Sequence, residues 1–263
     1  GLMFIPFTLF NFVLLLWAIK RLSGTFVIPL LAIATSALFL GRYVQLEQEE
    51  HVSTGDPSLK MISYNVGRFS RCNQESLFTF IREQEPDIVC LQEFYVSDID
   101  KVRDVLGRQM KDYHPEFYLF PMADGSAFGN VTLSRIPVKG KGKIKFEESA
   151  NLAIYTDYEY QGRMFRVYNC HFESYSISLP GLLRGLFKAD KAMMTETGIK
   201  VKRSITRRPK QVDKVFSDIE NCPVEAFVCG DFNDNPMSYS YFRMTRGRKD
   251  SFREAGKGFG ATF

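Results

Sequence analysis

The chain lacks several features that would place it in a familiar protein class. It has only five cysteines and three histidines in 263 residues, and an odd number of cysteines without framework spacing argues against a disulfide scaffold. The histidines and cysteines do not show the paired spacing of structural zinc sites. The net charge of +4 is too small to require nucleic acid as a partner, and the sequence has neither an internal repeat nor a low-complexity tract. The length therefore allows one large domain with an appendage.

Two long apolar runs occupy the N-terminal part of the chain. They cover about 2–19 and 25–41 and are joined by the short basic segment Lys20–Gly24. Each is close to the ~17–25 residues that cross a bilayer. We expect a transmembrane helical hairpin over 1–44, followed by a polar, acidic linker over 45–58. The alternatives are a buried core helix and the apolar core of a signal peptide.

The basic residues around the predicted hairpin suggest its orientation. Lys20 and Arg21 lie between the two runs, whereas Arg42 alone lies at the other end. Because positive charges mark the cytoplasmic side, the loop is expected in the cytoplasm. The rest of the chain would then lie outside, which for a bacterial inner membrane means the periplasm.

Four predicted strands end in polar side chains. Each is an apolar or alternating run that gives way to amide, carboxylate or imidazole groups, as when a buried strand brings polar groups to the rim of a sheet. Asp231 and Asn233 are two positions apart, so in an extended chain their side chains point to the same side. The runs are 59–66 with Asn65, 86–93 with Gln92 and Glu93, 164–173 with Asn169 and His171, and 224–236 with Gly230, Asp231 and Asn233.

One polar residue at a strand end is more often a cap or a turn residue than a ligand. Four such strand ends in one chain predict a shared site. Hard oxygen ligands with a single imidazole favour Mg²⁺ or Mn²⁺ over structural zinc.

These motifs, in this order, resemble the endonuclease/exonuclease/phosphatase superfamily. That superfamily includes DNase I-like nucleases, exonuclease III, inositol polyphosphate 5-phosphatases and neutral sphingomyelinases. The resemblance runs from about Leu59 to the last residue. The segments that carry it are Asn65, Leu91-Gln92-Glu93, Gly129 to Arg135, Asn169-x-His171, Gly230 to Asp234, Asp250-Ser251-Phe252 and Gly260 to Phe263.

The resemblance implies an α+β fold, a four-layer αββα sandwich in which two packed, mostly antiparallel sheets are covered by outer helices. The residue pattern agrees with it, because strands and helices alternate along the chain. We expect helices at 74–84 and 97–110 and further strands at 115–120, 129–135, 151–159 and 163–171.

The resemblance also implies Mg²⁺- or Mn²⁺-dependent hydrolysis of a phosphodiester or phosphomonoester by in-line attack of water. Glu93 is then a metal ligand, with Asn65 beside it. Asp231 orients or deprotonates the water, Asn233 holds the water or a phosphate oxygen, and His171 donates to the phosphoryl group. Asn169 is grouped with these catalytic residues. Substrate-binding roles are expected for Ser134 and Arg135 from the family-like strand, and for Arg207 and Arg208 from the basic cluster at 200–210.

One departure from the family concerns the end of the chain. Members of the superfamily finish with a strand that carries an Asp-His pair, whereas this sequence stops at Thr262-Phe263 and begins at Gly1. We expect a fragment clipped at both ends, with a further span upstream as in similar membrane-anchored members. Since loss of a charge-stabilising donor lowers rates by about 10²–10³, the fragment is expected to be nearly inert.

The segment before the fourth strand is basic. Residues 177–188 are mostly apolar with single basic residues among them, and a cluster of lysines and arginines follows at 200–210. It is either a loop with a solvated helix face or a flap beside His171 that faces lipid.

The expected partners are a membrane and a phosphoester substrate, either nucleic acid or a phospholipid or inositol phosphate. No protein partner is inferred. Two other functions stay open at this point, a non-catalytic membrane-tethered binding module and a cytosolic DNA-repair nuclease.

Overall fold

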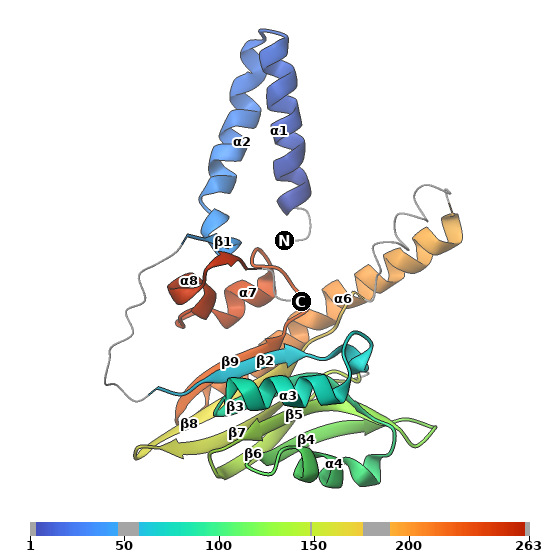
Figure 1. Cartoon of the computed structure of the whole chain (residues 1–263). Helices are drawn as coiled ribbons and strands as arrows, with labels where there is room; N and C mark the ends of the chain where they lie inside the picture. Colours follow the sequence, from blue (N-terminus) through green and yellow to red (C-terminus); the bar gives the residue numbers. More distant parts are fainter. Residues whose placement is uncertain (1–3, 47–57, 148, 176–189, 261–263) are drawn as a thin grey trace. The chain divides into compact units, whose positions relative to one another are not determined.

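The computed structural model describes residues 4–46, 58–147, 149–175 and 190–260 (Figure 1). Most of the predicted linker and the segment 177–188 lie outside the described residues. The chain divides into two compact units. One unit is Pro57–Asn233, and the other joins Gly1–Asp56 with Asp234–Phe263.

The first sheet of the unit Pro57–Asn233 has the strand order β2-β3-β5-β4. β2 and β3 are parallel, and the other pairs are antiparallel. Helices α3 and α4 cover one face, where Phe78, Ile81 and Leu106 are buried against the apolar side chains of β3 and β5. The elements are β2 (Met61–Asn65), α3 (Gln74–Gln84), β3 (Ile88–Val96), α4 (Val102–Gln109), β4 (His114–Pro121) and β5 (Ala127–Ser134).

The second sheet has the order β6-β7-β8-β9, with β8 and β9 parallel. Helix α6 belongs to this half of the unit, and it buries Val212, Val215, Phe216 and Ile219 at helical spacing. The Tyr168 hydroxyl of β8 donates to Asp218 Oδ1 of α6 over 2.6 Å, which ties the helix to the sheet. The elements are β6 (Val138–Lys145), β7 (Leu152–Tyr160), β8 (Arg163–His171), α6 (Lys191–Glu220) and β9 (Glu225–Asp231).

The two sheets pack on each other around a shared apolar layer. Ile88 and Cys90 of β3 lie in one buried cluster with Tyr158, Phe165 and Val167 of the second sheet. With helices on the outer faces (Figure 1), this is the predicted αββα sandwich, and the prediction is confirmed. All five cysteines are free thiols, as the absence of framework spacing indicated.

Strand β6 and the length of α6 were not predicted. In β6 lysines alternate with Gly140 and Gly142, and glycine is unusual inside strands. A side chain at Gly142 would collide with the ring of Tyr155 on the neighbouring strand, which explains the glycine. Helix α6 is continuous for 30 residues even though it contains Pro209.

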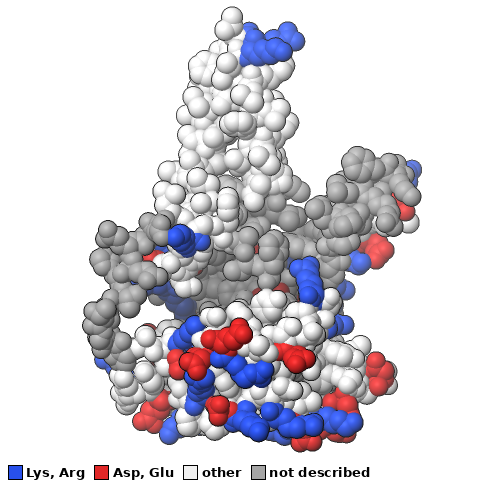
Figure 2. Space-filling model, viewed as in Figure 1, with Lys and Arg blue, Asp and Glu red and all other residues white. Residues whose placement is uncertain are grey.

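The second unit contains an apolar helical pair. α1 (Phe4–Lys20) packs against α2 (Val27–Ala37), and Thr8 Oγ1 donates to Ser36 Oγ between them over 3.2 Å. Figure 2 shows this pair as an uncharged surface with basic side chains at its tip. Most large apolar side chains of α1, such as Phe7 and Leu9, are more than half exposed.

By length and composition, one helical stretch of the described residues, Gly24–Arg42, could cross a membrane. Only 6% of its apolar window is buried, which differs from a core helix of a soluble protein, although a signal sequence passes the same test. The first predicted span corresponds to α1, whose 17 residues cover about 26 Å, less than the ~30 Å apolar thickness of a bilayer.

The C-terminal segment groups with the N-terminal one, whereas the sequence placed it in the domain 59–263. β1 (Val44–Gln45) pairs with β10 (Gly258–Phe259). Arg42 stacks over the Phe242 ring at 4.4 Å and donates to the Pro236 carbonyl. The other elements of this segment are α7 (Tyr239–Met244) and α8 (Ser251–Ala255).

Candidate active site

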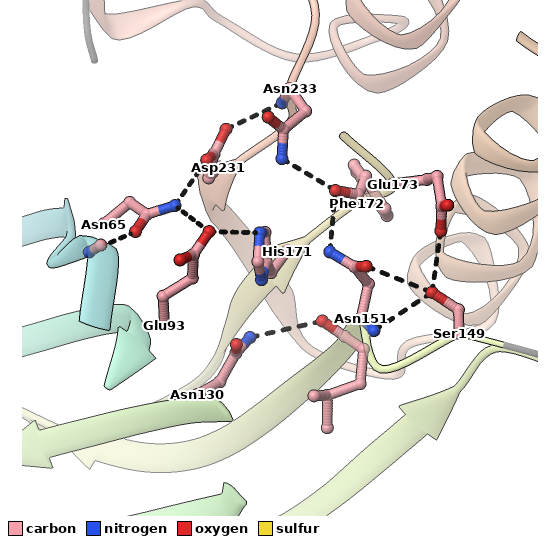
Figure 3. Close-up of polar contacts among 12 residues, drawn as sticks. Asn65, Glu93, Asn130, Ser149, Asn151, His171, Phe172, Glu173, Asp231 and Asn233 are labelled. Atoms are coloured by element: carbon pink, nitrogen blue, oxygen red, sulfur yellow. Dashed lines mark hydrogen bonds and ion pairs between the residues drawn. The ribbon is translucent and has the colours of Figure 1, made fainter. Parts of the chain in front are cut away.

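The polar ends of four strands meet at one rim of the sandwich (Figure 3). β2 and β3 run parallel with Asn65 opposite Gln92, and β8 and β9 run parallel with His171 opposite Asp231. The carboxyl ends of parallel neighbours lie at the same edge of a sheet, so pairing brings these groups together within each sheet. The packing of the two sheets then joins the two pairs at one rim.

The Asn65 amide links the two sheets. Its Nδ2 donates to Asp231 Oδ2 over 2.7 Å and lies 3.3 Å from Glu93 Oε1. Its Oδ1 accepts from the backbone N–H of Gly67 over 2.9 Å, which fixes the orientation of the amide. One amide group therefore lies between two carboxylates that come from different sheets.

Glu93 reaches the rim through a bulge in β3. The register against β5 shifts between Leu91 and Phe94, and Glu93 has a φ of 51°, which is unfavourable for a residue with a side chain. The side chain of Glu93 is 29% exposed, whereas that of its neighbour Gln92 is buried between the sheets. Backbone strain of this kind is concentrated at functional sites.

Asp231 and Asn233 are held by the turn that follows β9. Asp231 Oδ1 accepts from the backbone N–H of Asn233 over 2.8 Å, and Asn233 Nδ2 donates to the carbonyl of Phe172 over 2.9 Å. Gly230 has a φ of 132°, and a Cβ there would lie 1.9 Å from the Cys170 carbonyl oxygen. Only glycine allows β9 to approach β8 this closely, and the close approach brings Asp231 beside His171.

His171 is buried and carries an unpaired nitrogen. It is 6% exposed, and its Nε2 has no hydrogen-bond partner within the described part of the chain. The nearest acidic atom is Glu93 Oε1, at 3.6 Å. Burial lowers the pKa of His171, and the carboxylates of Asp231 and Glu93 offset this only in part, so the imidazole is neutral near pH 7. An orphan buried nitrogen at a polar rim is suited to an incoming ligand.

The donor set fits a small divalent cation. Glu93 and Asp231 supply hard carboxylate oxygens on either side of the Asn65 amide. Among the described residues no group of three or more His, Cys, Asp and Glu side chains is arranged to hold a metal ion. That is compatible with Mg²⁺, which keeps several waters and uses one or two protein carboxylates.

Asn169 lies two residues before the rim and is fully buried. Its Oδ1 accepts from Gln92 Nε2 over 2.7 Å, and its Nδ2 donates to the carbonyls of Leu91 and Val131 over 3.2 and 3.0 Å. This amide joins β8 to the first sheet. The structure therefore gives it a bridging position, whereas the sequence grouped it with the catalytic side chains.

An Asn169→Ala variant is expected to unfold at lower urea concentration, with a loss of about 1–3 kcal/mol in the free energy of unfolding. The reason is that two buried carbonyls lose their donor and Gln92 loses its shortest contact. Urea unfolding followed by circular dichroism measures the change. Unchanged stability together with a loss of hydrolysis would instead assign Asn169 to the chemistry.

Ser134 and Arg135 are not at this rim. β5 runs antiparallel to β3, so Ser134 pairs with Ile88 at the start of β3, and Glu93 lies near its other end. Ser134 Oγ is bonded to the backbone of Ile136, and the Arg135 N–H donates to the Asp87 carbonyl. This geometry corrects their expected substrate-binding role, and we leave both out of the proposed site.

Arg207 and Arg208 connect α6 to the chain just after β8. Arg208 is 2% exposed, and its Nε donates to the Glu173 carbonyl over 2.7 Å, so it anchors the helix. A guanidinium nitrogen of Arg207 lies 3.9 Å from the carboxylate of Glu173, and Arg203 lies 3.0 Å from it. Arg207 and Arg208 each contact Glu173 of the protein itself. These contacts do not support their expected roles in substrate binding.

Sequence reasoning missed the residues that brace the rim. Asn151 donates to the Phe172 carbonyl, and the Ser149 hydroxyl lies within hydrogen-bond distance of Asn151 Oδ1 and of a Glu173 carboxylate oxygen (Figure 3). Glu173, two residues after His171, is buried, and a buried acid usually has a partner. That burial is seen only in the structure, so the sequence carried no signal for these residues.

Comparison with known proteins places these features in a family. A model described as Endonuclease/Exonuclease/phosphatase family matches residues 62–263. A search of curated proteins found no match. The human Nocturnin catalytic domain with bound sulfate anion is 18% identical with a TM-score of 0.50, covering 72% of this chain and 69% of that chain. This similarity supports the fold alone.

Two further solved structures are less similar. Sphingomyelinase C from Streptomyces griseocarneus is 21% identical, with a TM-score of 0.48 and coverage of 73% of this chain and 70% of that chain. D. rerio TDP2 complexed with single strand DNA product is 19% identical, with a TM-score of 0.46 and coverage of 77% and 66%.

Proposed function

Because the chain belongs to the endonuclease/exonuclease/phosphatase family, whose members are phosphoric ester hydrolases, we propose that it is a membrane-tethered phosphoesterase dependent on Mg²⁺ or Mn²⁺. One observation carries the proposal. Two carboxylates, two amides and a neutral imidazole from both sheets converge at one rim, and the imidazole nitrogen is unpaired. These groups are Asn65, Glu93, His171, Asp231 and Asn233.

Asp231 is the proposed base for the attacking water. Each of its carboxylate oxygens accepts one hydrogen bond, from Asn65 Nδ2 and from the Asn233 N–H, so the carboxylate is held in one orientation. The water oxygen attacks phosphorus while its proton passes to Asp231. The bond from phosphorus to the leaving oxygen breaks on the opposite side, and the leaving alcohol takes up a proton from solvent.

His171 is the proposed donor to the phosphoryl group. Its neutral ring has one N–H, and a phosphoryl oxygen would give the unpaired nitrogen a partner. The hydrogen bond from a preorganised donor becomes stronger as negative charge builds on that oxygen in the transition state. Burial of the ring enhances the effect, because the local dielectric is low.

Glu93, with Asn65 beside it, would hold the divalent ion. When bound there, the ion supplies charge neutralisation of the phosphoryl oxygens. A second carboxylate, that of Asp231, contacts the same Asn65 amide. A bound cation would therefore offset the repulsion between the two negative charges at this rim.

The substrate class can be identified with a panel assay of the full-length protein. The panel contains single-stranded DNA, inositol phosphates, sphingomyelin and other phospholipids in mixed micelles, and bis-p-nitrophenyl phosphate. Each is tested with Mg²⁺, with Mn²⁺ and with EDTA. We expect hydrolysis of at least one phosphoester that EDTA abolishes. Metal-independent turnover, or binding without turnover for all substrates, would contradict the proposed function, and the second result would favour a binding module.

Membrane tethering is proposed from the apolar helices. The exposed apolar surface of α1 and the stretch Gly24–Arg42 is unsuited to water. The Ser36–Thr8 hydrogen bond between the helices is of the kind that joins helices in lipid. The basic tip, Lys20 and Arg21, favours a cytoplasmic loop and an external catalytic domain.

Protease added to intact spheroplasts is therefore expected to digest the catalytic domain and spare the hairpin. Immunoblots for each part, before and after detergent lysis, provide the measurement. Full protection of the domain in intact cells would reverse the topology and make nucleic acid the first substrate to test.

A further inference from the structure

The loop that follows Asn65 holds an arginine beside the candidate active site. Val66 is buried, and its N–H donates to the Gln92 carbonyl over 3.0 Å. The Phe69 ring packs edge-on against Phe94 with centroids 5.2 Å apart. The loop is thus fixed on both sides of Arg68, and its Gly67 N–H donates to the site residue Asn65.

The backbone of this loop is unusual. Gly67, Arg68 and Phe69 have φ values of 55°, 52° and 60° in succession. Left-handed backbone is ordinary for glycine but unfavourable for arginine and phenylalanine. The anchors Val66 and Phe69 hold the conformation in place, and Arg68 is kept on the surface between them.

The guanidinium of Arg68 is positioned by an aromatic ring. Its Cζ lies 3.9 Å from the centroid of Phe128 on β5, a stacked cation–π contact. No ion pair or hydrogen bond of the Arg68 side chain is present within the described residues. Stacking uses the flat face of the guanidinium and leaves the N–H groups at its edge available to donate to a phosphate oxygen.

Arg68 is three residues after the site residue Asn65, and its charge acts on His171. Its positive charge contributes to the lowered pKa of His171. The other charged groups that face His171 are the carboxylates of Asp231, Glu93 and Glu173. A phosphate approaching His171 therefore meets three carboxylates, and the charge of Arg68 opposes them.

We propose that Arg68 is a substrate-binding residue, whose guanidinium, stacked on Phe128, binds an oxygen of the phosphoryl group at the rim formed by Glu93, His171 and Asp231. The assignment deepens the proposed function and rests on it. It also implies a preference, because a fixed cation attracts a dianion more strongly than a monoanion. Arg68 should therefore contribute more to the binding of phosphomonoesters than of phosphodiesters.

Binding of inorganic phosphate to the full chain tests the assignment without requiring turnover. Isothermal titration of the metal-free protein is carried out for the wild type and for three variants. Arg68→Asn removes the charge and keeps a residue that tolerates left-handed backbone. Arg68→Lys keeps the charge without the planar fork. Arg71→Gln is the matched control, since Arg71 is an exposed arginine of the same segment.

We expect Arg68→Asn to weaken phosphate binding about ten-fold or more, as for loss of a charge-assisted contact. The phosphate affinity of Arg68→Lys should lie between those of Arg68→Asn and the wild type. The phosphate affinity of Arg71→Gln should equal that of the wild type. Equal phosphate affinity in Arg68→Asn and the wild type, with both folded by circular dichroism, would overturn the assignment. So would an equal loss in Arg71→Gln, which would indicate nonspecific surface charge.

Hydrolysis separates this assignment from the proposed function. If the full-length protein hydrolyses a phosphoester and Arg68→Asn leaves KM unchanged for both a monoester and a diester, Arg68 is not a substrate contact although the function stands. If no phosphoester is hydrolysed but phosphate binding still depends on Arg68, the anion site stands and the catalytic proposal fails.

Discussion

An Asp231→Asn variant is expected to lose about 10²–10⁴-fold in kcat for phosphoester hydrolysis, the usual contribution of a general base. The asparagine keeps the size of the side chain, and its one amide oxygen can still accept from the Asn233 N–H, so the turn after β9 should persist although the bond from Asn65 Nδ2 is lost. It cannot take a proton from water at neutral pH. Steady-state kinetics of the full-length protein on the best substrate of the panel measure the effect.

Asp104→Asn is the matched control for this variant. Asp104 is an exposed aspartate in the first turn of α4, and the same substitution there should leave kcat unchanged. Retention of more than about a tenth of the activity in Asp231→Asn would exclude a general-base role for this carboxylate.

A Glu93→Gln variant is expected to lose at least about 100-fold in affinity for Mn²⁺. Even outer-sphere partners of a metal change its affinity by about 10–100-fold when mutated, and Glu93 is the proposed ligand itself. Calorimetric titration with Mn²⁺ measures the loss, and Glu83→Gln on the exposed face of α3 is the control. Equal binding by the wild type and Glu93→Gln would remove Glu93 from the metal site.

Thermal unfolding distinguishes this loss from misfolding. In metal-free buffer Glu93→Gln should unfold at or above the wild-type temperature, because one of two carboxylates that share the Asn65 amide has been neutralised. The strained φ of Glu93 is retained in the variant, so the backbone of the bulge contributes equally to both proteins. A marked drop in unfolding temperature would make the affinity measurement uninformative about ligation and would contradict this charge argument.

The fold could be predicted from the sequence because its signals are local, and the rim residues were proposed from equally local strand ends. Asn65, His171 and Asp231 each end a strand, and parallel pairing places Asn65 beside Gln92 in one sheet and His171 beside Asp231 in the other. The packing of the two sheets then brings these strand ends together. Helix α3 was predicted at its observed bounds because Leu77, Phe78 and Ile81 repeat at helical spacing. In the structure all three are buried.

Features that depend on pairing between distant segments could not be read in this way. Ser134 and Arg135 were expected at the site because a motif does not reveal that β5 runs antiparallel to β3. The bulge at Glu93 and the bridging position of Asn169 depend on register and on contacts between sheets. Arg68 was overlooked because its importance comes from stacking on Phe128, a residue of another strand.

The pairing of the two ends of the chain could not be predicted from the sequence either. Apolar composition marked the two helices α1 and α2. The pairing of β1 with β10 joins residues at opposite ends of the chain, and two-residue strands leave no periodic signal in a sequence.

A divalent ion is expected to bind at the rim formed by Glu93, Asn65 and Asp231. Anomalous diffraction from crystals of the protein grown with Mn²⁺ tests it most directly. One anomalous peak is expected in contact with a Glu93 carboxylate oxygen, at about 2.0–2.2 Å in a site that water completes. Glu93→Gln crystals should show no such peak. A peak elsewhere, or an empty rim in crystals grown with saturating Mn²⁺, would contradict the claim.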